Sequence, residues 1–591
     1  NVNITSDNSG FPQIGISGLS TLGDTAFFPL KEIENVYQWL DNTTFIRGSH
    51  TFKAGIDFKK IQRNFTQILG PPAGSFSFGP NFTADPANPG NTGNAFADFL
   101  LGVPSSGSVV TTSGLAGLRT TEFSTYFQDT WKVTPNLTLS YGVRYDLFTP
   151  QTEVHDRQSN IDPITGKLVL PGQGGSYPGL STRALTSTNK LNFAPRVGIA
   201  YRIKEKTALR TSYGVFFMPE SQAGQQLTLN PPFVGGTNFV NTAVPQQINR
   251  TLNQGLPPSS GLIPIDNPRG SLNGAFPERH TAYTQQWSLS LQHEISSSFL
   301  LELNYVGNLS LHLQDQFNLN QAFLGTGNVQ ARRPFYSVGP NLTDFTYVEQ
   351  RGVGNYHGLQ VNLKKRYSNG LSFLTNYTWS KAIENPGSNY GNTGHQNARN
   401  LDADRALAGV DVRHRWVASM LYELPFGRGK YFATNANGLV NALVGGWQLG
   451  AVGTIQSGLP FTVSGGAGRP NRICNGQTPP GGHSVTEWFD VSCFVLPATV
   501  ADPIRGGVYI PFGNAGANVL TGPGIVNFDL SAFKTFAVTE SKRVEFRSEW
   551  FNAANHPQFL NPSSAINTGT TGRILNARPS RQVQMALKFI F

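Results

Sequence analysis

The chain has 591 residues, of which 14% are charged and 11% aromatic, so it carries far fewer charges than the quarter or so that is usual in soluble domains. Its net charge is +10, but we find no arginine-rich run and no zinc-ligand spacing, which argues against nucleic acid as a partner. No apolar run approaches the roughly eighteen residues of a spanning helix, so only strands could cross a membrane. We find no linker or break in composition, and we treat residues 1–591 as one domain.

Segments that alternate apolar and polar side chains recur along the chain, for example at 137–146, 371–380 and 544–550. Successive side chains of a strand point to opposite faces, so each segment predicts a strand with one apolar and one polar face. The polar faces are too charged to form a second core. The pattern predicts about sixteen strands, near 12–18, 34–46, 51–66, 121–132, 137–148, 193–203, 207–217, 282–294, 298–308, 357–367, 371–381, 413–424, 446–458, 525–536, 542–553 and 581–591.

Short and long connections alternate between these strands. The short connections carry turn residues and lie at Arg47–His50, Thr134–Asn136, Lys204–Lys206, Ile295–Ser297, Ser368–Gly370 and Thr539–Ser541. The long connections lie at about 67–120, 150–192, 218–281, 308–356, 382–412, 458–524 and 554–580. The connection at 425–445 is longer than its counterparts on the short-turn side, and we predict a short helix near Leu439–Val444. A second short helix is predicted at Asn94–Gly102.

This alternation is typical of an antiparallel up-and-down transmembrane β-barrel, with short periplasmic turns and long extracellular loops. We therefore predict an all-β fold with a water-wetted interior and an apolar exterior. Sixteen is an even number, as such barrels require, and it places the C-terminus on the periplasmic side.

The last stretch of the chain predicts the strand that closes the barrel. The apolar face of 581–591 carries Val583, Met585, Leu587, Phe589 and Phe591, whereas its other face is polar apart from Ile590. An apolar strand at a free sheet edge invites aggregation, so we expect it to pair with the first strand. The alternative is an ordinary last strand of a β-sandwich.

Five tryptophans lie near predicted strand ends and are candidates for the aromatic girdles at the two membrane interfaces. Each alone could equally be an ordinary strand residue, so the prediction depends on the set. They are Trp131, Trp287, Trp379, Trp447 and Trp550.

Cys474 and Cys493 are the two cysteines of the chain and fall within one long connection. We favour a disulfide between them, which implies an oxidising compartment. The alternative is a pair of free thiols.

Sequence motifs for catalysis are absent, including HExxH, GxSxG, CxxC and the phosphate-binding P-loop. Asp402, Asp404 and Asp411 lie in one predicted loop and could bind calcium, but their spacing does not match an EF-hand and we favour a solvated loop. We expect neither an enzyme, nor a cofactor, nor a metal site.

Several phrases resemble those of Oar-like TonB-dependent outer-membrane receptors, and the resemblance covers nearly the whole chain. They are Ile46–Phe58, Asn94–Gly102, Tyr126–Asp146, Leu421–Lys430, Leu443–Leu449 and Glu549–Phe559.

The resemblance implies a regulatory-like N-terminal domain, a plug and a barrel of about 22 strands. We find no TonB box, no plug and about sixteen strands, so the chain resembles the C-terminal portion of such a receptor, with the plug and some six strands expected upstream. Energy coupling through the TonB complex would use the missing plug, and no residue here can be assigned to it.

The function expected from this resemblance is capture of an external ligand by long loops, followed by passage through the lumen. Expected partners are outer-membrane lipid and lipopolysaccharide, the barrel-assembly machinery acting on the C-terminal strand, and an unidentified ligand, which could be a carbohydrate, a peptide or a siderophore. The expected location is the outer membrane of a Gram-negative cell. The alternatives are a passive porin, an adhesive or structural surface barrel, and a soluble secreted β-sandwich lectin.

Overall fold

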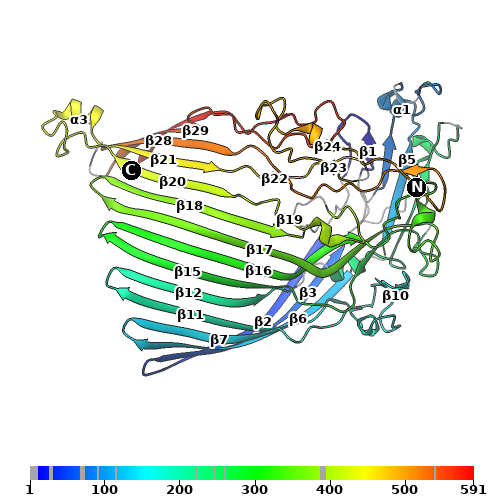
Figure 1. Ribbon diagram of the computed structural model, residues 1–591, viewed down its shortest axis with the longest axis horizontal. Coiled ribbons are helices and arrows are strands. Elements are labelled where there is room, and N and C mark those ends of the chain that lie inside the picture. The colour runs from blue at the N-terminus through cyan, green and yellow to red at the C-terminus, as the bar shows by residue number, and fades with distance from the viewer. Residues whose placement is uncertain are drawn as a thin grey trace.

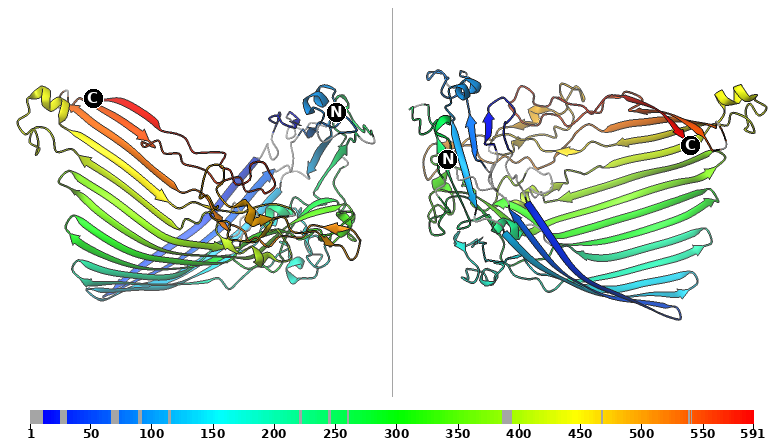
Figure 2. Two further views of the ribbon diagram at one scale, coloured as in Figure 1. Left: turned by 45° about the horizontal axis from the view of Figure 1, so that its top comes forward. Right: turned by 180° about the vertical axis from the view of Figure 1, so that it is seen from behind.

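The computed structural model describes residues 11–24, 31–66, 73–88, 92–112, 116–219, 223–243, 246–258, 261–385, 394–466, 468–537, 539 and 541–591. Long antiparallel strands form one curved sheet in these residues, and the long connections gather at one end of it (Figures 1 and 2). No helix among the described residues has the length and hydropathy needed to cross a bilayer.

The central sheet has 18 strands among the described residues. Fifteen of them pair in chain order as one antiparallel ladder: β2 (Lys31–Arg47), β3 (His50–Thr66), β6 (Ala116–Thr134), β7 (Leu137–Phe148), β11 (Phe193–Lys204), β12 (Thr207–Phe217), β15 (Tyr283–Ser296), β16 (Phe299–Asn318), β17 (Leu342–Ser368), β18 (Leu371–Glu384), β20 (His414–Glu423), β21 (Trp447–Gln456), β28 (Ile525–Ala537), β29 (Arg543–Phe551) and β30 (Gln582–Ile590). The other three are β8 (Thr152–Glu153), β14 (Gly270–Ala275) and β19 (Ala406–Leu407).

The predicted alternation of short and long connections is confirmed along this ladder. At the short-turn end, the hairpin between β17 and β18 carries Asn369 and Gly370 at φ values of +53° and +78°. Two consecutive left-handed residues make the two-residue turn whose twist matches antiparallel strands, and Asn-Gly is the pair that adopts it most readily. Local turn chemistry therefore sets the register of this hairpin.

Both predicted short helices are confirmed, as α1 (Ala95–Leu100) and α3 (Gly438–Val444), and the structure adds α2 (Ala223–Leu227). The long connections also contain separate two-stranded sheets. They are β9 (Asn160–Ile161) with β10 (Leu168–Val169), β22 (Pro460–Phe461) with β27 (Leu520–Thr521), β23 (Asn471–Arg472) with β24 (Phe494–Val495), and β25 (Val500–Ala501) with β26 (Val508–Tyr509). 3-10 helices lie at Pro178–Ser181, Leu252–Gln254, Gln330–Arg332, Leu401–Asp404 and Val491–Cys493.

Some ladder strands continue well past the ends predicted from alternation. The strand β17 has 27 residues, whereas the pattern predicted 357–367. Its first part pairs with the end of β16 across irregularities in register near His312, whose φ is +56°. Phe345 and Tyr347 in this part of β17 are buried and pack with Phe317 of β16, in a cluster that includes residues of the long connections.

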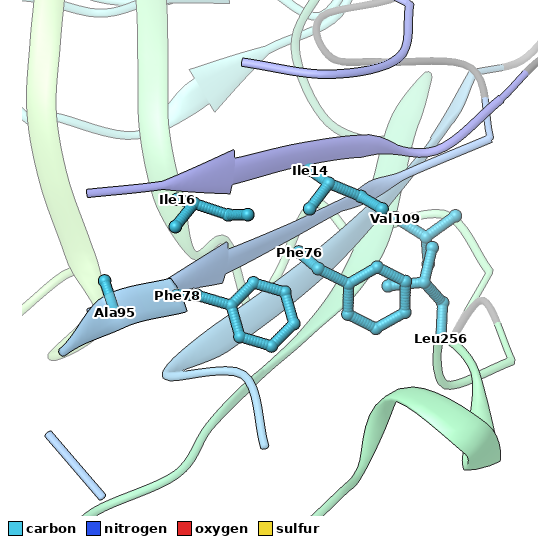
Figure 3. Packing of buried hydrophobic residues seen from close by; sticks show 7 residues of the cluster. All are labelled: Ile14, Ile16, Phe76, Phe78, Ala95, Val109 and Leu256. Carbon is cyan, nitrogen blue, oxygen red and sulfur yellow. The ribbon is translucent and has the colours of Figure 1, made fainter. Parts of the chain in front are cut away.

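The strand predicted at 12–18 does not belong to the central sheet, and that prediction was wrong. β1 (Gln13–Ile16) pairs in parallel with β4 (Ser75–Phe78), within a four-stranded sheet completed by β5 (Ser106–Thr112) and β13 (Val234–Val240). Figure 3 shows the core of this lobe, in which Ile14 and Ile16 pack with Phe76 and Phe78. Alternation identified a strand with one buried face, but it could not distinguish a loop lobe from a barrel wall.

The predicted closure of β30 on the first strand was also wrong. Among the described residues β30 pairs with β29 and β2 pairs with β3, so the sheet stays open at both edges. β2 and β30 both run from the long-loop end to the short-turn end. Direct pairing between them would be parallel, and an odd ladder of fifteen strands cannot close by antiparallel pairing alone.

The buried apolar clusters lie mainly within the long connections. They include the four-stranded lobe and a second cluster around Phe461, Phe489 and Phe494. The ladder strands instead leave their apolar face exposed, as at Trp379, which is 53% exposed. An apolar surface of this extent is unfavourable against water.

Candidate functional site

The polar face of the ladder, which we call the polar wall, carries cross-strand contacts at several places. Near the long-loop end, Arg63 donates to Glu32 at 2.5 and 3.0 Å. Farther along, Ser124 donates to Asp146 at 2.6 Å, and Gln292 donates to Glu302 at 2.8 Å. Charged groups that face each other across strands satisfy one another, so this face needs no apolar cover.

Two cavities lie along the strands of the ladder. One cavity of about 510 Å³ lies against β17, β18, β20, β21, β28 and β29, and its polar lining includes Lys364, Ser419, Asp529 and Glu549. A second cavity, of about 360 Å³, lies between the wall near Arg63 and residues of the long connections. Residues of the long connections therefore lie close to the polar face near Arg63.

Two of the long connections meet the extended end of β16 at a buried ionic cluster. Nε2 of His395 lies 2.7 Å from Asp315 Oδ1, and its Nδ1 lies 2.9 Å from Asp404 Oδ2. Arg469 donates to the other oxygen of Asp404. Asp315 lies in the last part of β16. His395 and Asp404 lie in the connection between β18 and β20, and Arg469 lies in the connection between β21 and β28. The cluster therefore fastens segments far apart in the sequence.

The charges of the cluster balance when His395 is protonated. Burial disfavours the imidazolium, but the hydrogen bonds to Asp315 and Asp404 and their negative charge outweigh it and raise the pKa of His395 to about 9. Burial also opposes the charged form of Asp404, yet its bonds to His395 and Arg469 lower its pKa. Two cations thus face two carboxylates at neutral pH.

Gln396, the residue after His395, adds hydrogen bonds beside this ionic cluster. The Gln396 side chain donates to the carbonyl of Gly513 at 3.1 Å and accepts from the backbone of Arg469 at 3.0 Å. The Gln321 side chain donates to the carbonyl of Gln396 at 3.0 Å. We call His395, Asp315, Asp404 and Arg469 the loop junction.

The expectation of a solvated loop at 402–411 was wrong for two of its three aspartates. Asp404 is buried in the loop junction, and Asp411 is buried and accepts a hydrogen bond from the backbone of Ala382 at 2.6 Å. Asp402 is exposed and pairs with Arg351. Sequence reasoning missed His395 and Arg469, because local spacing carries no sign that Asp315 lies 80 positions from His395 and Asp404 lies 65 positions from Arg469.

Cys474 and Cys493 are joined by a disulfide. Cys493 packs in the apolar cluster that includes Phe461, Phe489 and Ile566. Ile566 belongs to the connection after β29, so this cluster joins that connection to the one between β21 and β28. Asp490 lies beside both sulfur atoms, but neither sulfur is a free thiolate that could bind a metal.

Register places all five candidate tryptophans on the apolar face. Trp447 pairs with Lys534, which pairs with Phe546, and Trp550 pairs with Val583 of β30. Trp131 and Trp447 lie toward the short-turn end, whereas the other three lie toward the long-loop end. Trp416, opposite Tyr377 on the same face, also belongs with the second group.

The C-terminal strand lies at one edge of the sheet. The side chains of Val583, Met585, Leu587 and Phe589 are exposed on the apolar face, and Phe591 follows the last paired residue. Leu587 lies opposite Phe546 and Phe589 opposite Val544. The strand therefore continues the apolar face of β29.

Solved structures that the chain resembles are outer-membrane transporters and receptors. The outer membrane transporter YddB from Escherichia coli shares 9% identity at a TM-score of 0.49, with 95% of this chain and 55% of that chain covered. The ferripyoverdine receptor of Pseudomonas aeruginosa shares 11% sequence identity at a TM-score of 0.43, and the match covers 94% of this chain and 48% of the receptor. The ferric-catecholate import receptor Fiu from Escherichia coli K12 shares 13% sequence identity at a TM-score of 0.43, and the match covers 97% of this chain and 56% of the receptor.

The chain thus spans about half the length of these solved structures. No curated protein sequence matches it. Residues 1–584 match the family described as outer membrane beta barrel domain, which fits the alternating ladder and the polar interior wall. The chain belongs to this outer membrane β-barrel family, and its location is the outer membrane.

Proposed function

We propose that the chain forms the barrel wall of a TonB-dependent receptor, which captures an external ligand with its long loops and passes it through the lumen. The observation that carries the proposal is the loop junction, because it ties two long connections to the extended end of β16 through buried charges. A passive pore needs only an open mouth, whereas ligand capture needs loops held in a defined arrangement. The resemblance to Oar-like receptors supports the same assignment.

Further strands would complete the barrel. Closure of a ladder of fifteen strands by antiparallel pairing needs an odd number of additions between β30 and β2. About seven would reach the roughly 22 strands of the large plugged barrels. A plug would occupy the interior that these strands enclose, and force from the TonB complex would act on that plug.

The apolar face would contact outer-membrane lipid and lipopolysaccharide, with the tryptophans at the two interfaces. Charged or polar residues there would be costly, and the exposed apolar side chains of β28 and β30 suit this environment. The free edge of β30, which ends beside Phe591, is the segment on which the barrel-assembly machinery would act.

Solute uptake by a deletion strain tests the proposal. Wild-type and deletion cells are compared for depletion of siderophores, peptides and oligosaccharides, with and without a protonophore. We expect one solute class to be depleted more slowly by the deletion strain, and the difference to vanish when the protonophore removes the energy source. Uptake of many small solutes regardless of the protonophore would instead indicate a porin. Unchanged uptake with reduced surface attachment would indicate an adhesive barrel.

A further inference from the structure

The connection between β20 and β21 is an exception to the tight turns at the short-turn end. It carries α3 beyond the ends of the strands (Figures 1 and 2). Leu439 is 75% and Leu443 is 65% exposed, and Tyr431 and Phe432 are exposed nearby. A simple hairpin at this end needs only two to five residues. This connection is much longer, and the apolar surface that it exposes is unfavourable in water.

The base of this connection is closely packed. Gly427 has a φ of +112°, and a Cβ on it would come within 2.7 Å of Gly445 Cα. Asn441 Oδ1 accepts the backbone N–H of Arg428 at 2.7 Å, so this side of α3 faces the base. Leu439 and Leu443 lie two residues to either side of Asn441 and therefore project from the opposite side of the helix.

Two side chains from the sheet hold the end of α3. Trp447 Nε1 and Lys534 Nζ each donate to the carbonyl of Leu443 at 2.9 Å. Lys534 is only 3% exposed, and its ammonium also lies 5.1 Å from the ring centre of Trp447. A cation at the C-terminal carbonyls of a helix is favourably placed. The contacts fix the helix to the rim of the sheet.

These anchoring residues belong to the apolar face of the ladder. Trp447 pairs with Lys534, and Lys534 pairs with Phe546, whose ring lies 6.2 Å from that of Trp447. α3 is thus tied to the outer side of the rim, and its leucines continue the exposed apolar surface of the strands.

The charges near α3 indicate the chemistry of its partner. Residues 424–446 contain Arg428 and Lys430 and no acidic residue, and Lys430 forms an ion pair with Glu423 at the end of β20 at 2.9 Å. Basic side chains beside an apolar surface are typical of segments that lie in the headgroup region, where they meet lipid phosphates.

We propose that α3 and the aromatic residues beside it are a membrane anchor that inserts into the periplasmic leaflet of the outer membrane. The inference rests on the proposed lipid contact of the apolar face. Leu439 and Leu443 would enter the boundary between headgroups and acyl chains, to the roughly 5–10 Å depth of interfacial helices. The Arg428 side chain would remain among the phosphates.

Fluorescence quenching in vesicles tests the anchor. The full-length protein carries one environment-sensitive thiol label, introduced by Leu439→Cys, in phosphatidylethanolamine–phosphatidylglycerol vesicles with or without doxyl-labelled lipid. Ser297→Cys is the matched control, because Ser297 is exposed in a tight turn at the same end. Leu530→Cys reports the apolar face itself, since Leu530 is exposed on β28.

We expect the doxyl lipid to quench the labels at 439 and 530 several-fold more than the label at 297. Quenching at 530 but not at 439 would overturn the anchor and leave the barrel orientation intact. Quenching at neither position would overturn both. A label at 439 that is shielded from aqueous iodide but not quenched by lipid would indicate a protein partner, such as a second copy, and would also overturn the anchor.

Discussion

Nε2 of His395 lies 2.7 Å from Oδ1 of Asp315, 80 residues earlier in the chain, and both side chains are 1% exposed. The same imidazole contacts Asp404, which Arg469 also binds. This one side chain therefore couples the extension of β16 to two long connections.

Removal of one charge from the loop junction should loosen those connections. Asp404→Asn leaves the cations of His395 and Arg469 short of one carboxylate, and loss of one partner of a buried ion pair typically costs about 3–5 kcal/mol. We expect faster proteolysis of 394–413 and 457–524 in intact outer membranes. Asp402→Asn is the control, because Asp402 is 80% exposed and an exposed pair contributes about 0–1 kcal/mol. Equal proteolysis rates in the two variants would contradict the assignment.

The stability of the loop junction should depend on alkaline pH. The folded-state pKa of His395, about 9, lies above its ordinary value of 6.5. Its stabilising contribution is therefore complete below about pH 6.5 and is lost as the pH rises through about 9. Amide exchange of 394–413, corrected for intrinsic rates, should show protection falling over this range. The His395→Gln variant should lack this transition, and a transition of the same size in that variant would assign it to another group.

Loss of the disulfide should affect one loop and not the sheet. Its cysteines are 19 positions apart, and a loop of that length is worth about 3 kcal/mol in the chain-entropy model. We expect Cys474→Ser, or reduction of the wild type, to accelerate cleavage within 457–524. The heat-modifiable electrophoretic mobility of the barrel serves as the control and should not change. An unchanged cleavage rate would show that the surrounding apolar cluster suffices.

The base of the α3 connection should tolerate no side chain at Gly427. Gly427→Ala introduces a Cβ into backbone at a positive φ, and we expect loss of amide protection in α3. Gly438→Ala is the matched control, because nothing lies within 4 Å of a Cβ there. Alanine is the better helix former by about 1 kcal/mol, so the control should keep or gain protection. Equal loss in both variants would contradict the close packing.

The ladder strands could be predicted from the sequence because each has one polar and one apolar face. The same signal at Ile14 and Ile16 came from a lobe of the long connections, where a four-residue strand buries its apolar face against Phe76 and Phe78. Alternation reports that one face avoids water, but not which apolar neighbour covers it. This is why alternation predicts a barrel strand at 12–18 and gives sixteen barrel strands, whereas the ladder has fifteen.

The loop junction could not be predicted, because its four residues come from three separate segments. The local sequence marks Asp404 only as a member of an acidic loop, and His395 lies in no recognisable motif. In contrast, the face on which Trp447 and Trp550 lie could be predicted, since it follows from alternation along their strands. The place of the tryptophans at the membrane interfaces stays a prediction.

Cysteine accessibility along β18 tests the central claim most directly. Single cysteines are placed from Ser372 to Ser380 in the full-length protein and treated with a membrane-impermeant thiol reagent in permeabilised cells. We expect labelling at 372, 374, 376, 378 and 380, which face the polar interior, and protection at 373, 375, 377 and 379, which face lipid. Labelling of the second set with protection of the first, or no alternation at all, would contradict a lipid-facing apolar wall around a wet lumen.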